Sequence, residues 1–156
     1  MTLKSFSVAL LVALSLSTAV VSHAAGPQPD AARELSAALK EAWADVKAER
    51  YEAGIGKLEA IVAGEPGNAD ALSWLGFANR KLGRFDISYG WYEKALAIDP
   101  DHLGANEYLG ELYVQTGEME KAEGQLGKLE KLCPFGCEEL DDLKEAIAEA
   151  RKKGGG

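Results

Sequence analysis

The stretch Ala69–His102, ADALSWLGFANRKLGRFDISYGWYEKALAIDPDH, decides the fold because its pattern returns on both sides of it. Its proline, Pro100, has counterparts 34 residues before and after, at Pro66 and Pro134. A fixed period of this length over three units is the sequence signature of a solenoid, in which each unit packs against its neighbours. The flanking units are residues 35–68 and 103–136.

Each unit contains two apolar patterns with helical spacing. In the middle unit, Leu72 and Leu75 belong to the first pattern, which breaks at Gly83. The second pattern ends before Pro100, which cannot continue a helix. Each unit is therefore predicted to be a helix, a tight turn and an antiparallel helix, and the fold class is all-α. Gly76 and its counterpart in the next unit cost a helix about 1 kcal/mol each relative to alanine, which indicates close helix packing at these positions.

These units resemble tetratricopeptide repeats, from residue 35 to residue 136. The middle unit matches the family pattern at Leu72, Leu75, Gly76, Tyr92, Ala95 and Pro100, and the third at Leu109, Gly110, Tyr113, Ala122, Leu126 and Pro134. Departures occur at Asn79 and Ser88 in the middle unit and at Asn106 and Leu129 in the third. The resemblance implies a solenoid of helix pairs that binds a protein or peptide in a concave groove.

The first unit, 35–68, has two alternative registers for its first helix. The register of the repeat places Glu41 and Asp45 where apolar residues belong. A shift by one residue points Leu39, Ala42 and Val46 inward instead.

The two ends of the chain are expected to serve export and capping. Residues 1–24 have a lysine, an apolar run and small residues before Ala25, which is typical of a secretory signal peptide. Residues 25–34 are interpreted as a linker and the start of the first helix. Residues 137–153 carry one apolar stripe and a charged opposite face, as expected of a helix that caps a repeat array. Residues 154–156 form a glycine tail.

Composition narrows the partners that the chain can bind. The 156 residues carry a net charge of −8, which disfavours binding to nucleic acid or to anionic lipid surfaces. No further segment is long and apolar enough for membrane insertion after signal cleavage. The expected location is outside the cytoplasm, in a bacterial periplasm, with secretion from another cell type as the alternative.

The two cysteines of the chain, Cys133 and Cys137, flank the turn Pro134–Gly136 before the capping helix. In an oxidising compartment such a pair is expected to form a disulfide that fixes the angle of the cap. Redox exchange and metal binding are the alternatives. Against them stand a spacing unlike that of thioredoxin-type enzymes and the distance in sequence to His102, which is expected in a solvated turn.

The acidic run Glu138, Glu139, Asp141 and Asp142 either attracts a cation or is a helix start with a solvated face. The sequence contains no catalytic motif, no phosphate-binding loop and no set of metal ligands, so neither an enzyme nor a cofactor is predicted.

The resemblance implies a partner-binding groove lined by the first helices of the units. Carried over position by position, its residues are Leu39, Trp43, Lys47, Ser73, Phe77, Arg80, Lys81, Glu107, Glu111, Val114 and Gln115. This groove is apolar and basic at one end and acidic at the other. Leu39 and Trp43 stand where family members that bind a terminal carboxylate have lysine and asparagine, so that mode is not expected. Trp43 is either an exposed anchor or a core residue.

The sequence thus predicts a non-catalytic adaptor or scaffold of the cell envelope that binds a protein or peptide in the groove. The alternative is a redox- or metal-handling accessory protein that acts through Cys133 and Cys137. Weak self-association through exposed apolar surface is a third hypothesis.

Overall fold

The computed structural model describes residues 29–154, and the expected signal peptide, residues 1–24, lies outside them. The described residues form the helices α1 (Pro29–Lys47), α2 (Tyr51–Gly64), α3 (Ala69–Lys81), α4 (Phe85–Ile98), α5 (Leu103–Gln115), α6 (Met119–Leu132) and α7 (Glu138–Gly154), with no strand among them. Within this range no helix has the length and apolar character needed to cross a membrane. The predicted linker region, residues 25–34, therefore includes the first residues of α1. Helix α7 includes Gly154, the first residue of the predicted glycine tail.

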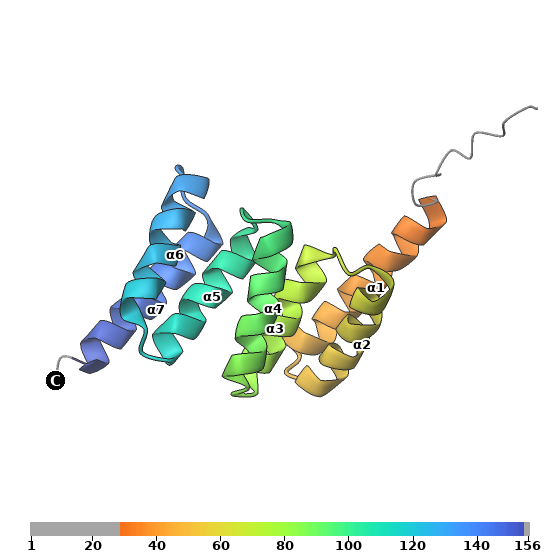
Figure 1. The fold of residues 1–156 in the computed structure, drawn as a ribbon, viewed down its shortest axis with the longest axis horizontal. Helices are drawn as coiled ribbons and strands as arrows, with labels where there is room; N and C mark the ends of the chain where they lie inside the picture. Colours follow the sequence, from red (N-terminus) through yellow and green to blue (C-terminus); the bar gives the residue numbers. More distant parts are fainter. Residues whose placement is uncertain (1–28, 155–156) are drawn as a thin grey trace, which may run out of the picture.

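The helices form three hairpins and a final single helix, stacked side by side (Figure 1). The first helices contact one another in order, α1 with α3, α3 with α5 and α5 with α7, so they form one layer. The second helices, α2, α4 and α6, form the other layer and each packs between successive first helices. The prediction of an all-α solenoid of three helix pairs with a terminal helix is therefore confirmed.

The turn inside each hairpin repeats the same backbone geometry with the 34-residue period. Glu49, Gly83 and Gly117 occupy equivalent positions, and each has a positive φ, of 58°, 73° and 79°. The next amide reaches back five residues in each case; the N–H of Arg84, for example, donates to the carbonyl of Asn79 at 2.9 Å. This is the hydrogen bond that closes a helix with a left-handed residue, and glycine adopts that conformation without the steric cost that Glu49 bears.

The turns between hairpins are also periodic, because each supplies a side chain that caps the next helix. The Asn68 side chain accepts a hydrogen bond from the N–H of Ala71 at 2.9 Å at the start of α3. His102, 34 residues later, accepts from the N–H of Ala105 through Nδ1 at 3.1 Å, and its Nε2 lies 3.1 Å from Asp70 of α3. The expectation of a solvated His102 is therefore wrong: the ring caps α5 and links two repeats.

The closest contact between helices of one hairpin is made at Gly76. A Cβ atom there would lie 2.3 Å from the ring of Tyr92, which is fully buried in α4. The carbonyl of Gly76 also accepts a hydrogen bond of 2.7 Å from the hydroxyl of Ser88. Ser88 departs from the family pattern, and this bond explains why a polar residue is stable there. Gly110 meets Leu143 of α7, so its missing side chain makes room for the cap.

The first helix buries Ala42 and Val46, while Glu41 stays exposed and forms an ion pair with Lys57 of α2. Asp45 is also buried, contrary to what a purely apolar inward face requires. It is stable there because Lys57 lies 2.8 Å from its carboxylate and Arg50 forms a second ion pair with it. Both predicted registers are thus partly right for this helix.

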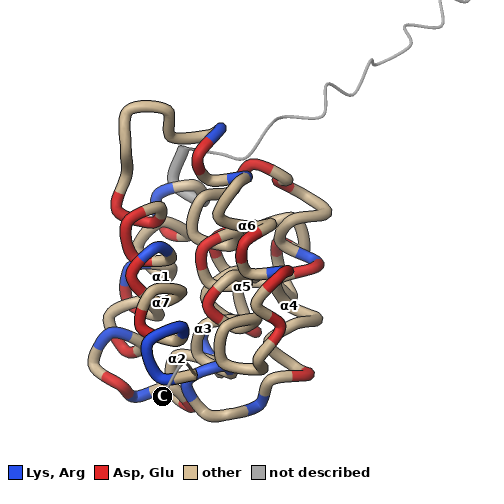
Figure 2. The backbone as a smooth tube through the Cα atoms, turned by 90° about the vertical axis from the view of Figure 1, so that its left-hand side faces the viewer, with Lys and Arg blue, Asp and Glu red and all other residues tan. Residues whose placement is uncertain are grey.

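The terminal helix α7 covers the last repeat with Leu140, Leu143 and Ile147, all of which are buried. Figure 2 looks along the array from this end and shows the basic residues of α7 gathered at its last turn. One of them, Arg151, pairs with Glu123 of α6 at 2.5 Å. Cations at this end of a helix are favoured by its dipole, as are the acidic residues at its first turn.

The packing at Gly76 gives a stability prediction. Gly76→Ala should destabilise the protein by about 1–3 kcal/mol, because the new methyl group collides with a buried ring that has no space to move. Gly90→Ala in α4 is the matched control: its Cβ meets no atom within 4 Å, so it should stabilise the helix by about 0.5–1 kcal/mol. Urea unfolding followed by circular dichroism measures both, and equal effects of the two substitutions would contradict the packing argument.

Candidate binding site

A pocket of about 630 Å³ lies on the layer formed by the first helices. Side chains from α1, α3, α5 and α7 line it, together with residues of the first turn and the start of α2. Six of the eleven predicted groove residues are among them: Trp43, Lys47, Phe77, Lys81, Glu107 and Glu111. The solenoid thus brings together residues that are far apart in sequence, as a groove between successive repeats requires.

An aromatic row runs through this pocket from the first repeat to the third. The rings of Trp43 and Phe77 meet edge to face with centroids 5.5 Å apart, and Phe77 lies 4.8 Å from Tyr108. Trp43 is also stacked on Trp74, with centroids 4.8 Å apart. Trp43 therefore has both roles considered from the sequence, since it packs against the core and also lines the pocket. Rings held in this way offer apolar contact area at little entropic cost.

The charged groups of the pocket are unevenly distributed: two lysines and Glu49 line the side of the first repeats, and the other carboxyls line the opposite side. Lys47 of α1 and Lys81 of α3 lie at the side of the first repeats, and the ammonium group of Lys81 stands 5.1 Å from the Phe77 ring. Five carboxyls come from the other side, two on α5 and three on the first turns of α7, at Glu107, Glu111, Glu138, Glu139 and Asp142. This polarity agrees with the one predicted from the sequence.

Glu107 is the most deeply placed of these carboxyls, with 5% of the residue exposed. No hydrogen bond or ion pair joins its carboxylate to another described residue, and the carboxylate oxygens stay accessible to solvent from the pocket. Burial, together with the nearby negative charges of Glu111, Asp142 and Glu139, raises the pKa of Glu107 to about 8. The carboxyl is therefore largely protonated at neutral pH unless a positive charge arrives beside it.

The remaining predicted groove residues lie outside this pocket. Arg80 is buried beneath it, 3% exposed, and forms an ion pair with Glu111. Ser73 is fully buried among the helices, so it offers no surface to a ligand. Leu39 packs against the core of the first repeats, and Val114 and Gln115 line a separate hollow beside α7.

Several lining residues were missed by sequence reasoning. Tyr108 completes the aromatic row. It could have been predicted from the sequence, because it directly follows the predicted groove residue Glu107 on α5. Glu138, Glu139 and Asp142 were expected either to attract a cation or to lie on a solvated helix face. Glu138 and Asp142 are exposed, and all three line the groove. The capping helix therefore adds the acidic wall of the pocket as well as covering the last repeat.

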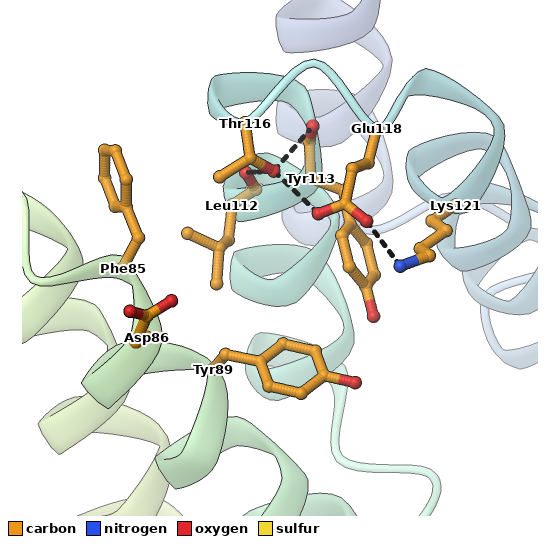
Figure 3. A pocket seen from close by; sticks show the side chains of 8 residues that line it. All are labelled: Phe85, Asp86, Tyr89, Leu112, Tyr113, Thr116, Glu118 and Lys121. Carbon is orange, nitrogen blue, oxygen red and sulfur yellow. Dashed lines mark hydrogen bonds and ion pairs between the residues drawn. The ribbon is translucent and has the colours of Figure 1, made fainter.

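A second hollow, of about 430 Å³, lies between α4, the end of α5 and the start of α6 (Figure 3). Phe85 and Tyr89 of α4 face Leu112 and Tyr113 of α5 across it. Its polar rim is satisfied internally: Thr116 donates a hydrogen bond to Glu118 at 3.0 Å, and Glu118 pairs with Lys121.

The cysteine turn lies between α6 and α7 and directly precedes Glu138, which lines the groove. The sulfur atoms of Cys133 and Cys137 are 2.23 Å apart and their Cα atoms 5.8 Å apart. Gly136 adopts a positive φ of 91°, which permits the sharp change of direction. Phe135 is completely exposed at the tip of this turn.

A family model for tetratricopeptide repeats matches residues 39–102, which include most of the first repeat and all of the second. The chain is a tetratricopeptide repeat protein.

Two curated relatives match this chain over a short part of their own length. Tetratricopeptide repeat protein 37 of Xenopus laevis is 29% identical over 100 residues, and Superkiller complex protein 3 of Mus musculus is 26% identical over 100 residues. In each case the match covers 64% of this chain and 6% of the relative. This tetratricopeptide repeat protein therefore spans only a small fraction of the length of these relatives.

Solved structures of tetratricopeptide repeat domains share the fold. The type III secretion translocator chaperone SycD of Yersinia enterocolitica superposes with a TM-score of 0.67 at 17% identity, covering 81% of this chain and 95% of that chain. The first such domain of Spaghetti (RPAP3), solved with the HSP90 peptide SRMEEVD, gives 0.65 at 17% identity and covers 77% and 94%. At these identities the likeness shows the fold alone.

The state of Glu107 gives a prediction for stability against pH. The pKa of this carboxyl is about 8 in the folded protein and near 4.5 when unfolded, so its own contribution to stability is largest below pH 4.5 and is lost as pH rises to 8. Glu107→Gln should remove this loss, on the order of 2 kcal/mol after allowance for the solvent on the open side of the pocket. Urea unfolding of both proteins at pH 5 and pH 8 measures the difference.

The control for this experiment is Glu130→Gln, which removes the same charge from an exposed position on α6. It should follow the wild type at both pH values. If the Glu107 variant and the wild type keep a constant difference in stability from pH 5 to pH 8, the carboxyl is ionised throughout and the burial argument fails.

Proposed function

We propose that the protein is a non-catalytic adaptor that binds a protein or peptide of the cell envelope in the groove between α1, α3, α5 and α7. The observation that carries this proposal is the continuous aromatic row of Trp43, Phe77 and Tyr108 in a pocket with charged ends. Domains of this fold are commonly protein-interaction adaptors, which supports the general role. An aromatic row with polar ends suits an extended or helical peptide, since the rings supply contact area and the charges fix its direction.

The envelope location is part of the proposal and rests on residues 1–24, whose sequence is typical of a signal peptide. Two cysteines at bonding distance agree with an oxidising compartment. Expression of the full chain in its own source, followed by fractionation and determination of the mature N-terminus, tests this part. A mature chain that begins at Ala25 in the envelope fraction supports it, and an intact Met1 terminus in the cytoplasm contradicts it.

The groove is tested with two matched aromatic substitutions. Phe77→Ala should weaken the capture of an envelope partner about tenfold or more, because it removes the middle ring of the row. Phe85→Ala removes an exposed ring from the second hollow and should leave capture unchanged. Quantitative pull-down from envelope extract, followed by titration of the identified partner, measures both effects.

Two other results of this pull-down have a clear meaning. Equal capture by the wild type and both variants would place the site elsewhere on the protein. Loss with Phe85→Ala alone would move the site to the second hollow. Association of the protein with itself would appear as capture of its own chain, which size-exclusion chromatography separates from a true partner.

The alternative function, thiol or metal chemistry at Cys133 and Cys137, has less support. Among the described residues, no cysteine is free and no group of three potential ligands is placed to hold a metal ion. We propose instead a structural disulfide that fixes the direction in which α7 leaves α6.

The disulfide is tested by thiol labelling. Unfolded protein from the exported fraction should take up no maleimide before reduction and should label at both cysteines afterwards. Reduction should lower the stability by only about 1–2 kcal/mol, because the loop that the bond closes is short. Labelling without reduction would contradict the staple and favour thiol chemistry.

A further inference from the structure

One group of the groove, the carboxyl of Glu107, lacks a hydrogen-bond or ion-pair partner in the described part of the free protein. It is 95% buried, lines the pocket and has no partner among the described residues. Buried carboxyls in folded proteins are usually hydrogen-bonded or ion-paired, whereas the Glu107 oxygens have no such partner within residues 29–154 and are open to the pocket. A group of this kind at the floor of an open pocket marks the place where a ligand atom completes it.

The sign of the missing partner follows from what surrounds Glu107. Glu111 lies one turn further along α5, and Glu139 and Asp142 face it from α7. The nearest positive charge is Arg80 of α3, which is already paired with Glu111. The surroundings therefore repel an anion and favour a cation, and they resemble the arrangement in which like charges keep one carboxyl protonated.

Arg80 shows how this part of the molecule holds a cation. Its guanidinium lies 5.3 Å from the centroid of the Phe77 ring and 6.0 Å from that of Tyr108, while it pairs with Glu111. One helical turn away, Glu107 offers a second carboxyl beside the same aromatic pair, and this carboxyl has no cation. Glu107 and Glu111 thus offer two equivalent carboxyls, one turn apart, for a cation beside aromatic rings. The protein's own Arg80 pairs with Glu111, and Glu107 is left for a ligand.

We propose that the acidic end of the groove binds a lysine or arginine side chain of the partner, with its cation on Glu107, beside the aromatic pair and beneath α7. This rests on the proposed function, because it requires that a peptide segment lies in the groove. A metal ion fits less well, since no group of three possible ligands is arranged to hold one among residues 29–154. Lys47 and Lys81 at the opposite side of the pocket then disfavour the reverse orientation of the same peptide.

Binding of the basic side chain should change the protonation of Glu107. This change can be measured, and a residue with a purely structural role would not produce it. In the free protein Glu107 holds its proton at neutral pH, for the reason given above. An arriving cation favours the ionised form, so binding releases a proton from Glu107. The charged groups that face it are Arg80, Glu111, Glu139 and Asp142, and the three acidic groups favour a cation at this place.

The test uses random twelve-residue peptides displayed on phage and selected on the purified protein. The wild type should enrich peptides that carry a lysine or arginine at one fixed position relative to their apolar residues. The best of these, made synthetically, should bind Glu107→Gln about ten- to a hundredfold more weakly, because a charged hydrogen bond is lost. Glu130→Gln, with the same change on the outside of α6, should bind like the wild type.

Calorimetry in two buffers of different ionisation enthalpy at pH 7 supplies the second measurement. Binding to the wild type should release a proton, and binding to Glu107→Gln should not. Asp142→Asn keeps the Glu107 carboxyl and removes an exposed neighbour, so it should still release a proton and bind a fewfold more weakly. Circular dichroism checks that each variant is folded.

The outcomes separate this inference from the proposed function. Peptides that depend on Phe77 but show no basic residue, or bind Glu107→Gln as well as the wild type, overturn the inference and leave the groove as the binding site. Failure to enrich any peptide overturns both. Basic peptides that bind without proton release and without dependence on Glu107 place the cation on the outer carboxyls of α7 and also overturn the inference.

Discussion

The contact between Gly76 and the ring of Tyr92 is the constraint on which the rest of this solenoid depends. It brings α3 and α4 so close that no side chain fits at Gly76, and it buries the largest side chain of the core. The third repeat places Gly110 against Leu143 of α7 by the same device, so the cap docks as another helix of the array. Because each hairpin buries its apolar surface only against neighbours, these two contacts set the spacing of the layer that forms the groove.

The period of 34 residues could be read from the sequence because each of its elements has a local physical cause. Gly83 and Gly117 supply the left-handed residue of the turn, and the prolines stop the second helices. The same logic did not extend to the first helix, where a buried Asp45 stands at an apolar position. Its burial depends on Lys57 and Arg50, which are brought to it by the fold and by the turn. An ion pair of this kind, between residues that the fold brings together, produces no periodic pattern in the sequence.

The groove was only partly predictable for a similar reason. Trp43, Phe77 and Glu107 follow from their positions in the repeat, since equivalent positions of successive first helices face the same side. The acidic wall on α7 did not follow, because an acidic first turn is also what any helix start favours. Only the docking angle of α7, set by Gly110 and the cysteine turn, turns Glu139 and Asp142 toward the pocket.

The carboxyls of the acidic wall repel one another, and protonation of Glu107 reduces this repulsion in the free protein. Arg80 neutralises Glu111, and a proton neutralises Glu107, so the buried floor of the groove carries little net charge while it is empty. The exposed carboxyls of α7 keep their hydration and provide the attraction at longer range. Such a site selects a ligand whose cation reaches Glu107 at the floor of the groove, because only that contact offsets the free energy needed to ionise this carboxyl. A positive charge that stays at the rim gains the screened attraction alone, which is worth far less.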